Sequence, residues 1–226
     1  MSVRLVGCVF VAAVLASPGC ITAQDLGSHA ASNEGGAVNP FPPAGDGSSP
    51  FPGPAEKIVF VTDGLFTADL AMEGGAASGL QGGDNLCNTE ARDAGLGGTF
   101  RAWLSTSTEN ARDRIAAVGP WRMVKGPDVL FPDRSAGGTP KGFLQYTAKG
   151  NDLFFTNESN VWTGTKDTGT VNVATCAGWT SGLASQTGTY GQFTWTSGFW
   201  TDYRGFEAAG LSKPCSTRLR LYCFEQ

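Results

Sequence analysis

Four cysteines limit the folds open to this chain more than any other feature of its sequence. Cys87, Cys176, Cys215 and Cys223 are separated by 89, 39 and 8 residues, so no Cys-x-x-Cys pair is present. With no histidine nearby, this spacing argues against a zinc site and favours disulfides. Four cysteines allow three pairings, and spacing alone does not choose among them. Pairing Cys87 with Cys223 would close the region end to end, and a bridge over so long a loop would strongly stabilise the folded domain.

The N-terminus has the pattern of an export signal. Export would place the cysteines in an oxidising compartment, where disulfides form. Arg4 precedes the apolar run Leu5–Ala16, which is too short to span a bilayer but fits a signal peptide. We expect residues 1–20 to be the signal region and Cys20 to be lipidated, as in an outer-membrane or cell-surface lipoprotein. The alternative is ordinary cleavage, for example after Ala23, and a secreted protein. Membrane contact is expected only through the lipid anchor.

Residues 21–55 are predicted to be a disordered tether. Six of the 12 prolines lie between Pro40 and Pro54, and the rest of the stretch is rich in glycine and serine. Such a segment has too few large apolar residues to offset the entropy of ordering itself. The single histidine, His29, lies here. We therefore place the folded domain at residues 56–226.

Charge and composition exclude several classes of function. The chain carries a net charge of −4, and 15 of its 16 basic and 17 of its 20 acidic residues follow residue 55, so no basic domain is hidden in it. This argues against nucleic acid as a partner. With its histidine outside the domain, the chain has no imidazole for catalysis there. Its glycine pairs lack the spacing of a phosphate loop, and no cofactor is expected.

The first half of the domain shows alternating strand and helix patterns. A β-branched and aromatic run predicts a strand over residues 57–62. A helix is predicted from Asp84 as its N-cap, with Cys87, Ala91 and Ala94 on one face. A buried strand follows at residues 99–105.

A second helix and a terminal strand complete the predicted elements. The helix is predicted to start at Thr106, with Glu109 at capping-box spacing, and to end at Gly119-Pro120. Residues 217–225 alternate, so that Leu219, Leu221 and Cys223 face one way and Arg218, Arg220 and Tyr222 the other. This order predicts an α+β fold with an antiparallel sheet.

A series of residues along the domain resembles a known family. It consists of Gly83-Asp84, Cys87, Ala91-Arg92, Gly95-Leu96, Gly98–Ser105, Leu130-Phe131-Pro132, Val161-Trp162, Gly164, Cys176, Trp179, Leu221-Tyr222-Cys223 and Glu225. The series closely resembles the endostatin domain that ends the multiplexin collagens, and it covers nearly the whole domain in order. It also resembles bacterial endostatin-like surface proteins, often lipoproteins, of the C-type-lectin-like fold.

The resemblance implies both a fold and a type of function. The fold would be α+β and C-type-lectin-like, with two helices, a mostly antiparallel sheet, long loops and the nested disulfides Cys87–Cys223 and Cys176–Cys215. No metal is expected, because the domain lacks the histidines of the endostatin zinc site and the calcium motifs of sugar-binding C-type lectins. The function would be binding rather than catalysis.

The segment Tyr190–Phe206 is the best candidate for recognition. It holds seven aromatic residues among glycine, threonine and serine, a composition typical of adaptable contact surfaces. The ligand-binding candidates are Trp195, Trp200, Asp202, Tyr203 and Arg204. The alternative interpretation is that these rings form the core of the loop region, since large aromatics are often buried.

These observations predict an exported, surface-anchored, non-catalytic module that binds an extracellular protein or glycan. Two alternatives remain open. One is a carboxylate-based glycan hydrolase, for which Asp202 and Glu207 are the candidate pair. The other is a purely structural envelope protein whose disulfides serve durability.

Overall fold

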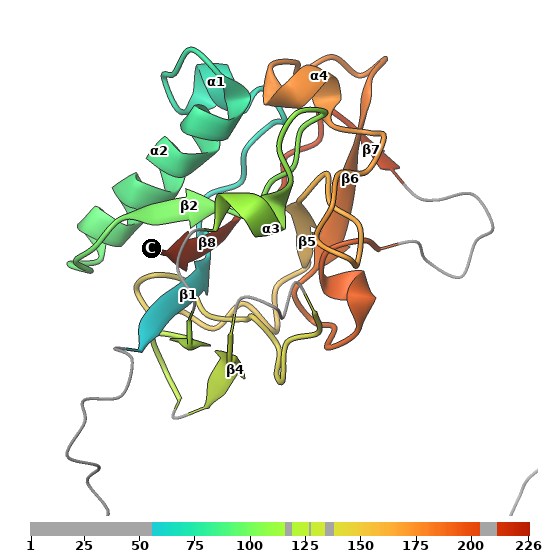
Figure 1. The fold of residues 1–226 in the computed structure, drawn as a ribbon. Helices are drawn as coiled ribbons and strands as arrows, with labels where there is room; N and C mark the ends of the chain where they lie inside the picture. The colour runs from blue at the N-terminus through green and yellow to red at the C-terminus, as the bar shows by residue number, and fades with distance from the viewer. Residues whose placement is uncertain (1–55, 116–118, 127, 134–137, 204–211) are drawn as a thin grey trace, which may run out of the picture. The chain divides into compact units, whose positions relative to one another are not determined.

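The structure is a computed structural model that describes residues 56–115, 119–126, 128–133, 138–203 and 212–226 (Figure 1). All of these residues belong to one compact unit, Ser49–Gln226. The predicted signal and its lipidation site Cys20, the predicted tether, and Arg204 and Glu207 lie outside the described residues. The described part is a mixed α+β structure with few helices and two sheets.

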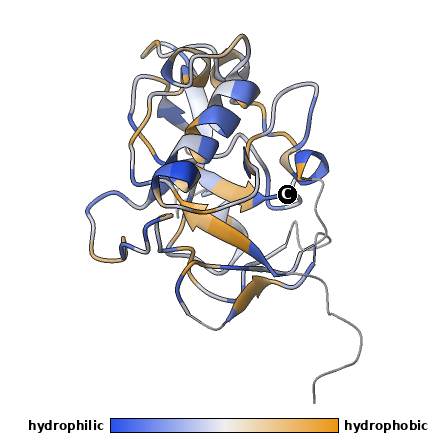
Figure 2. Ribbon diagram, turned by 90° about the vertical axis from the view of Figure 1, so that its left-hand side faces the viewer, coloured by the Kyte–Doolittle hydropathy of each residue, from blue (hydrophilic) through white to orange (hydrophobic). Residues whose placement is uncertain are grey.

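The larger sheet has five strands in the order β2-β8-β1-β3-β4. These are β1 (Lys57–Val61), β2 (Phe100–Ala102), β3 (Trp121–Arg122), β4 (Val129–Phe131) and β8 (Tyr222–Glu225). The C-terminal strand β8 lies between β1 and β2 and is antiparallel to both, whereas β1 and β3 are parallel. The predicted strand at 57–62 is confirmed, and that at 99–105 is shorter than predicted. Apolar residues gather along these strands (Figure 2).

The smaller sheet has three antiparallel strands in the order β5-β6-β7. These are β5 (Asn160–Trp162), β6 (Thr187–Gln192) and β7 (Ser212–Pro214). A bridge between Val161 and Arg220 connects this sheet to the segment that leads into β8. The smaller sheet is thereby attached to the core of the larger one.

The longest helix, α2 (Gly79–Asp93), follows the one-turn helix α1 (Leu70–Glu73). Cys87 and Ala91 lie on its buried face as predicted, but the prediction of Asp84 as N-cap is wrong. Ser78 caps the helix by accepting a hydrogen bond from the Gln81 backbone N–H. Three glycines near its start misled the prediction, because glycine disfavours helix.

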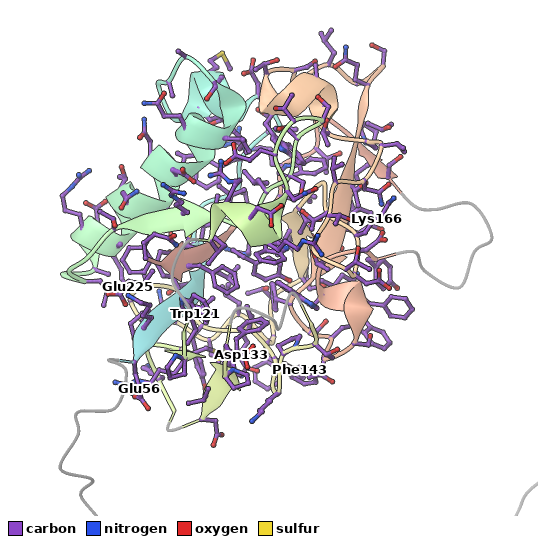
Figure 3. All side chains as sticks on the ribbon, viewed as in Figure 1. Glu56, Trp121, Asp133, Phe143, Lys166 and Glu225 are labelled. Carbon is purple, nitrogen blue, oxygen red and sulfur yellow. A yellow bond between two sulfur atoms is a disulfide. The ribbon has the colours of Figure 1, made fainter. Side chains whose placement is uncertain are left out.

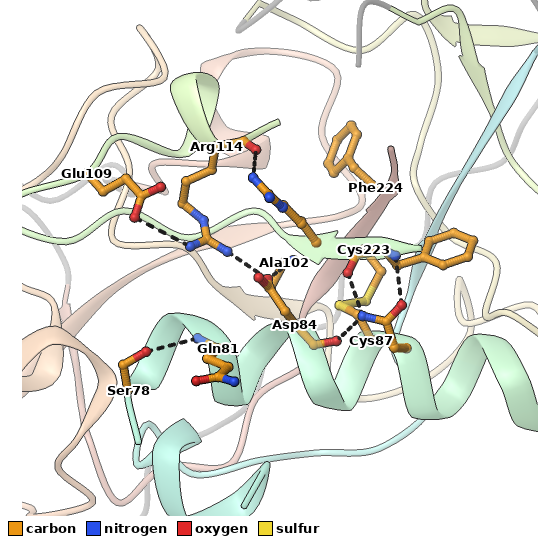
Figure 4. Close-up of polar contacts among 12 residues, drawn as sticks. Ser78, Gln81, Asp84, Cys87, Ala102, Glu109, Arg114, Cys223 and Phe224 are labelled. Atoms are coloured by element: carbon orange, nitrogen blue, oxygen red, sulfur yellow. Dashed lines mark hydrogen bonds and ion pairs between the residues drawn. A yellow bond between two sulfur atoms is a disulfide. The ribbon is translucent and has the colours of Figure 1, made fainter. Parts of the chain in front are cut away.

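Asp84, one and a half turns into α2, connects the helix to the sheet. One carboxylate oxygen accepts hydrogen bonds from the Ala102 backbone N–H at 2.9 Å and from Arg114 Nη2 at 2.7 Å (Figure 4). The Arg114 side chain is only 5% exposed. Burial raises the pKa of Asp84, and the Arg114 guanidinium opposes that rise. This buried ion pair therefore fixes α2 against β2 and against the short helix α3 (Ala111–Arg114), which carries Arg114.

The second predicted helix is much shorter than expected. Thr106 and Glu109 do not form a capping box, because their backbones pair with each other across a tight turn. Helix α3 spans Ala111–Arg114, and the Ser105 hydroxyl accepts a hydrogen bond from the Ala111 backbone N–H. The remaining short elements are α4 (Cys176–Trp179), a single left-handed turn in which all four residues have positive φ, and the 3₁₀ helix η2 (Gly198–Trp200). Among the described residues, none of the helices combines the length and the apolar character that a transmembrane span requires.

The alternation predicted for the C-terminal run is confirmed. Leu219, Leu221 and Cys223 lie in one apolar cluster with α2, and Tyr222 lies in a second cluster rich in tryptophan and phenylalanine. Arg220, on the same side as Tyr222, is also buried, and its guanidinium donates to the carbonyl oxygens of residues 62 and 63. Both faces are therefore covered from Leu219 to Phe224, whereas Arg218 at the start of the run is exposed, and the strand itself is limited to Tyr222–Glu225.

The two nested disulfides are present as the resemblance implied. Cys87 of α2 is bonded to Cys223 of β8, and Cys176 of α4 is bonded to Cys215, directly after β7. The first joins the long helix to the central strand, and the second joins the two ends of the loop region that contains β6 and η2. Disulfides of this kind are consistent with an extracellular location.

Replacing Tyr222 by phenylalanine is expected to reduce the loss of stability that accompanies a rise to alkaline pH. Complete burial raises the pKa of Tyr222 well above its usual value of 10. The folded protein therefore keeps a proton that the unfolded chain releases, so stability falls as pH rises above 10, by roughly 1 kcal/mol per pH unit. Urea titrations between pH 8 and 11 measure the free energy of unfolding. Its decrease with rising pH should be smaller for the variant than for the wild type.

At neutral pH the same variant should be about 1 kcal/mol less stable. The Tyr222 hydroxyl donates to the Trp200 carbonyl oxygen at 2.8 Å, and removing it leaves that acceptor unpaired. An unchanged alkaline slope would contradict the burial argument.

Candidate ligand-binding surface

The described part of the predicted recognition segment, Tyr190–Tyr203, runs from the end of β6 through a turn into η2. It forms the side of the molecule that faces away from α2 (Figure 1). Its backbone is held to the smaller sheet, since the Tyr203 N–H donates to the Tyr190 carbonyl at 2.9 Å. The segment therefore folds back on β6, and side chains from both arms meet.

Trp200 is not a surface residue, and its prediction as a ligand-binding residue is corrected. Its side chain is 0% exposed and packs against Trp103, Phe131 and Tyr222 at ring-centroid distances of 5.1 to 5.2 Å. For this ring the alternative interpretation as loop core is the right one. Trp200 fastens η2 to the aromatic cluster of the larger sheet.

Gly191 allows η2 to pack against β6, because the two elements approach each other very closely at this residue. A Cβ at Gly191 would overlap the carbonyl oxygen of Trp200. No residue with a side chain fits there unless η2 moves outward. The position of η2, and of the rings it carries, therefore depends on this glycine.

Three half-buried rings meet near the buried Trp200 and form what we call the aromatic patch: Trp195, Phe199 and Tyr203. Their centroids are 5.3 Å apart for Trp195–Phe199, 5.7 Å for Phe199–Tyr203 and 6.3 Å for Trp195–Tyr203. Phe199 and Tyr203 meet edge to face, and so do Trp195 and Phe199. Mutual ring contacts of this kind hold the patch in one arrangement.

Tyr190 of β6 lies beneath one side of the patch. Its ring contacts Tyr203 at 5.8 Å, and Lys213 Nζ of β7 lies 5.0 Å from its ring centroid. Burial raises the pKa of the Tyr190 hydroxyl, and Tyr203 and Glu158 add to the rise. The hydroxyl therefore stays neutral at physiological pH, and Lys213 supplies a positive charge next to the rings.

A chain of side-chain hydrogen bonds extends from the patch across the smaller sheet. Trp195 Nε1 donates to Gln192 Oε1 at 2.8 Å, and Gln192 Nε2 donates to Asn160 Oδ1 at 2.9 Å. Asn160 Nδ2 donates in turn to a carboxylate oxygen of Glu158 at 2.6 Å. These bonds fix the plane of the Trp195 indole and leave further amide hydrogens and lone pairs for a ligand.

The other predicted polar residues are placed differently. Asp202 is 5% exposed, and its carboxylate accepts a hydrogen bond from Asn172 at 3.4 Å, so it lies beneath the surface rather than on it. Arg204, and Glu207 of the proposed carboxylate pair, lie outside the described residues. Within the described part, no group of three or more histidine, cysteine, aspartate or glutamate side chains is placed to hold a metal.

Trp195 and Tyr203 are among the residues predicted from the sequence, whereas Phe199, Gln192 and Asn160 are not. Gln192 precedes Trp195 by three residues, and that short spacing was the available signal for a turn closed by the two side chains. Asn160 carries no such signal, because strand pairing with Gln192 brings it there. The patch and its amide chain offer ring faces and hydrogen-bonding groups.

No protein-family model matches this chain, and no curated protein matches it.

Proposed function

We propose that this chain is an exported, surface-anchored, non-catalytic binding module of the endostatin-like, C-type-lectin-like type. Its ligand is an extracellular glycan or protein, held on the aromatic patch. The support for the type is the series of endostatin-like residues together with the mixed α+β structure and its two nested disulfides.

The observation that carries the proposed activity is the fixed, partly exposed ring arrangement of Trp195, Phe199 and Tyr203. Their positions are set by a buried anchor and by Gly191, and the indole of Trp195 is oriented by Gln192. A rigid apolar surface loses little entropy when it binds, so its contact area contributes directly to affinity.

A glycan is the ligand class that the surroundings favour. The C–H faces of a sugar stack on aromatic rings, and its hydroxyl groups pair with planar amides such as those of Gln192 and Asn160. A hydrolase acting through Asp202 has less support, since that carboxylate is buried and bonded to Asn172.

The proposal is tested by probing a glycan array and a panel of extracellular matrix proteins with the full chain. Binding to a related set of glycans, without release of cleaved sugar, is the expected result. Selective binding to one matrix protein would support the binding role but would make the ligand a protein instead of a glycan. An absence of binding on both platforms would reject it in favour of a structural envelope role.

A further inference from the structure

A cleft of about 600 Å³ opens at the turn between β3 and β4, and it shares no residue with the aromatic patch. Its apolar wall includes Met123, Val129 and Leu130, and its charged lining residues are Lys125, Lys141 and Asp128. A volume of this size lies within the range of binding sites that enclose a ligand or part of one. Nothing in the proposed function uses it.

Two lysines against one aspartate give the cleft lining a net charge of +1, although the domain is acidic overall. Lys125 and Lys141 are exposed, and neither forms an ion pair with any described residue. The Lys125 hydrocarbon chain lies across Gly150, whose φ of +76° and missing side chain leave room for it. Lys141 is held at its backbone, where its N–H donates to the Leu130 carbonyl at 3.0 Å. Two lysine side chains without an ion-pair partner among the described residues thus line one cleft.

An exposed shelf of three phenylalanines continues outward from the cleft rim. Phe143, which also lines the cleft, is 37% exposed, and Phe154 and Phe155 are 41% and 89% exposed. Phe143 (Figure 3) and Phe154 stack with centroids 5.8 Å apart, and Phe155 meets Phe154 edge to face at 5.1 Å. Exposed aromatic clusters of this kind mark interaction sites.

The loop that carries the shelf is held in place by Asp152. Its carboxylate accepts a hydrogen bond from the Phe154 backbone N–H at 2.8 Å and from the Gln145 side-chain amide at 3.2 Å. Gln145 itself lines the cleft. Cleft and shelf are therefore parts of one connected surface.

We propose that this surface binds an extended acidic peptide segment of a protein partner. A carboxylate of the segment enters the cleft between Lys125 and Lys141, and an apolar side chain beside it covers the phenylalanine shelf. A small anion would fill the cleft but leave Phe155 in water, so the shelf points to a longer ligand. The concave cleft suits an extended segment better than the flat surface of a membrane.

Selection of a random displayed-peptide library on the full chain tests this inference. The enriched peptides should carry aspartate or glutamate next to a large apolar residue. As synthetic peptides they should bind at least tenfold more weakly to Lys125→Ala/Lys141→Ala and to Phe155→Ala, and more weakly at high salt. Lys166→Ala, an exposed lysine on the side of β6 (Figure 3), is the matched control and should bind like the wild type.

Three outcomes overturn the inference. One is an enriched set without acidic residues, or no enrichment at all. Another is equal binding by the double-lysine variant and the wild type. The third is binding of the full chain to phosphatidylglycerol vesicles that is lost in Phe155→Ala, since that result assigns the surface to a membrane. Because all the substituted residues are exposed, circular dichroism should show unchanged folding.

Discussion

Replacing Cys87 and Cys223 together by alanine is expected to lower the free energy of unfolding by about 5 kcal/mol. The two residues are 136 positions apart in sequence, so their bridge removes more entropy from the unfolded chain than the shorter bridge does. Both cysteines are 0% exposed, and alanine leaves no unpaired polar group at either site. Denaturant titration under non-reducing conditions measures the loss.

The second disulfide provides the matched control. Cys176 and Cys215 are 39 positions apart, so their replacement by alanine should cost about 4 kcal/mol. Since small domains have about 5 to 15 kcal/mol of stability in total, the titrations need a stabilising salt such as sulfate. A larger loss from the shorter bridge than from the longer one would contradict the chain-entropy argument.

Replacing Arg114 by methionine is expected to cost about 3 kcal/mol. The substitution leaves the Asp84 carboxylate, whose side chain is 23% exposed, without the guanidinium that lies 2.7 Å from it. It also removes the longer contact of 3.8 Å to Glu109. An unpaired carboxylate in this position has to be protonated or hydrated at the expense of the fold, which a urea titration at pH 7 records.

The double variant Asp84→Asn/Arg114→Met separates the unpaired charge from the lost packing. Asparagine keeps an oxygen for the Ala102 N–H but carries no charge. The double variant should therefore be more stable than Arg114→Met alone. Burial already raises the pKa of Asp84, so the deficit of the single variant should shrink as pH falls toward 4. If the single and the double variant lose the same free energy of unfolding, the unpaired charge of Asp84 is not the cause of the loss.

The elements that the sequence predicted well are those set by local pattern. Alternation around Leu221 identified the central strand β8, and the series of endostatin-like residues implied the disulfide pairing that spacing alone left open. The true start of α2 escaped prediction because Gly82 is buried against the backbone of Leu70, a tertiary contact in which a Cβ would clash. Propensity cannot anticipate such a contact.

The candidate site was predictable as a segment but not residue by residue. Trp195 and Trp200 occur in similar surroundings in the sequence, yet one ring is half-buried at the surface and the other is fully buried. The difference comes from the path of η2, which is fixed by its contact with Gly191 in another element. The phenylalanine shelf was missed although Phe154-Phe155, an aromatic pair in a polar loop, was visible in the sequence.

The affinity of the Trp195→Ala variant for a ligand found on the array tests the central claim most directly. If the aromatic patch is the binding surface, loss of the indole should weaken binding about 30-fold, as expected for an aromatic hot spot. Met72→Ala, which removes an exposed apolar side chain on α1, should bind like the wild type. Equal affinity of Trp195→Ala and the wild type would contradict the account.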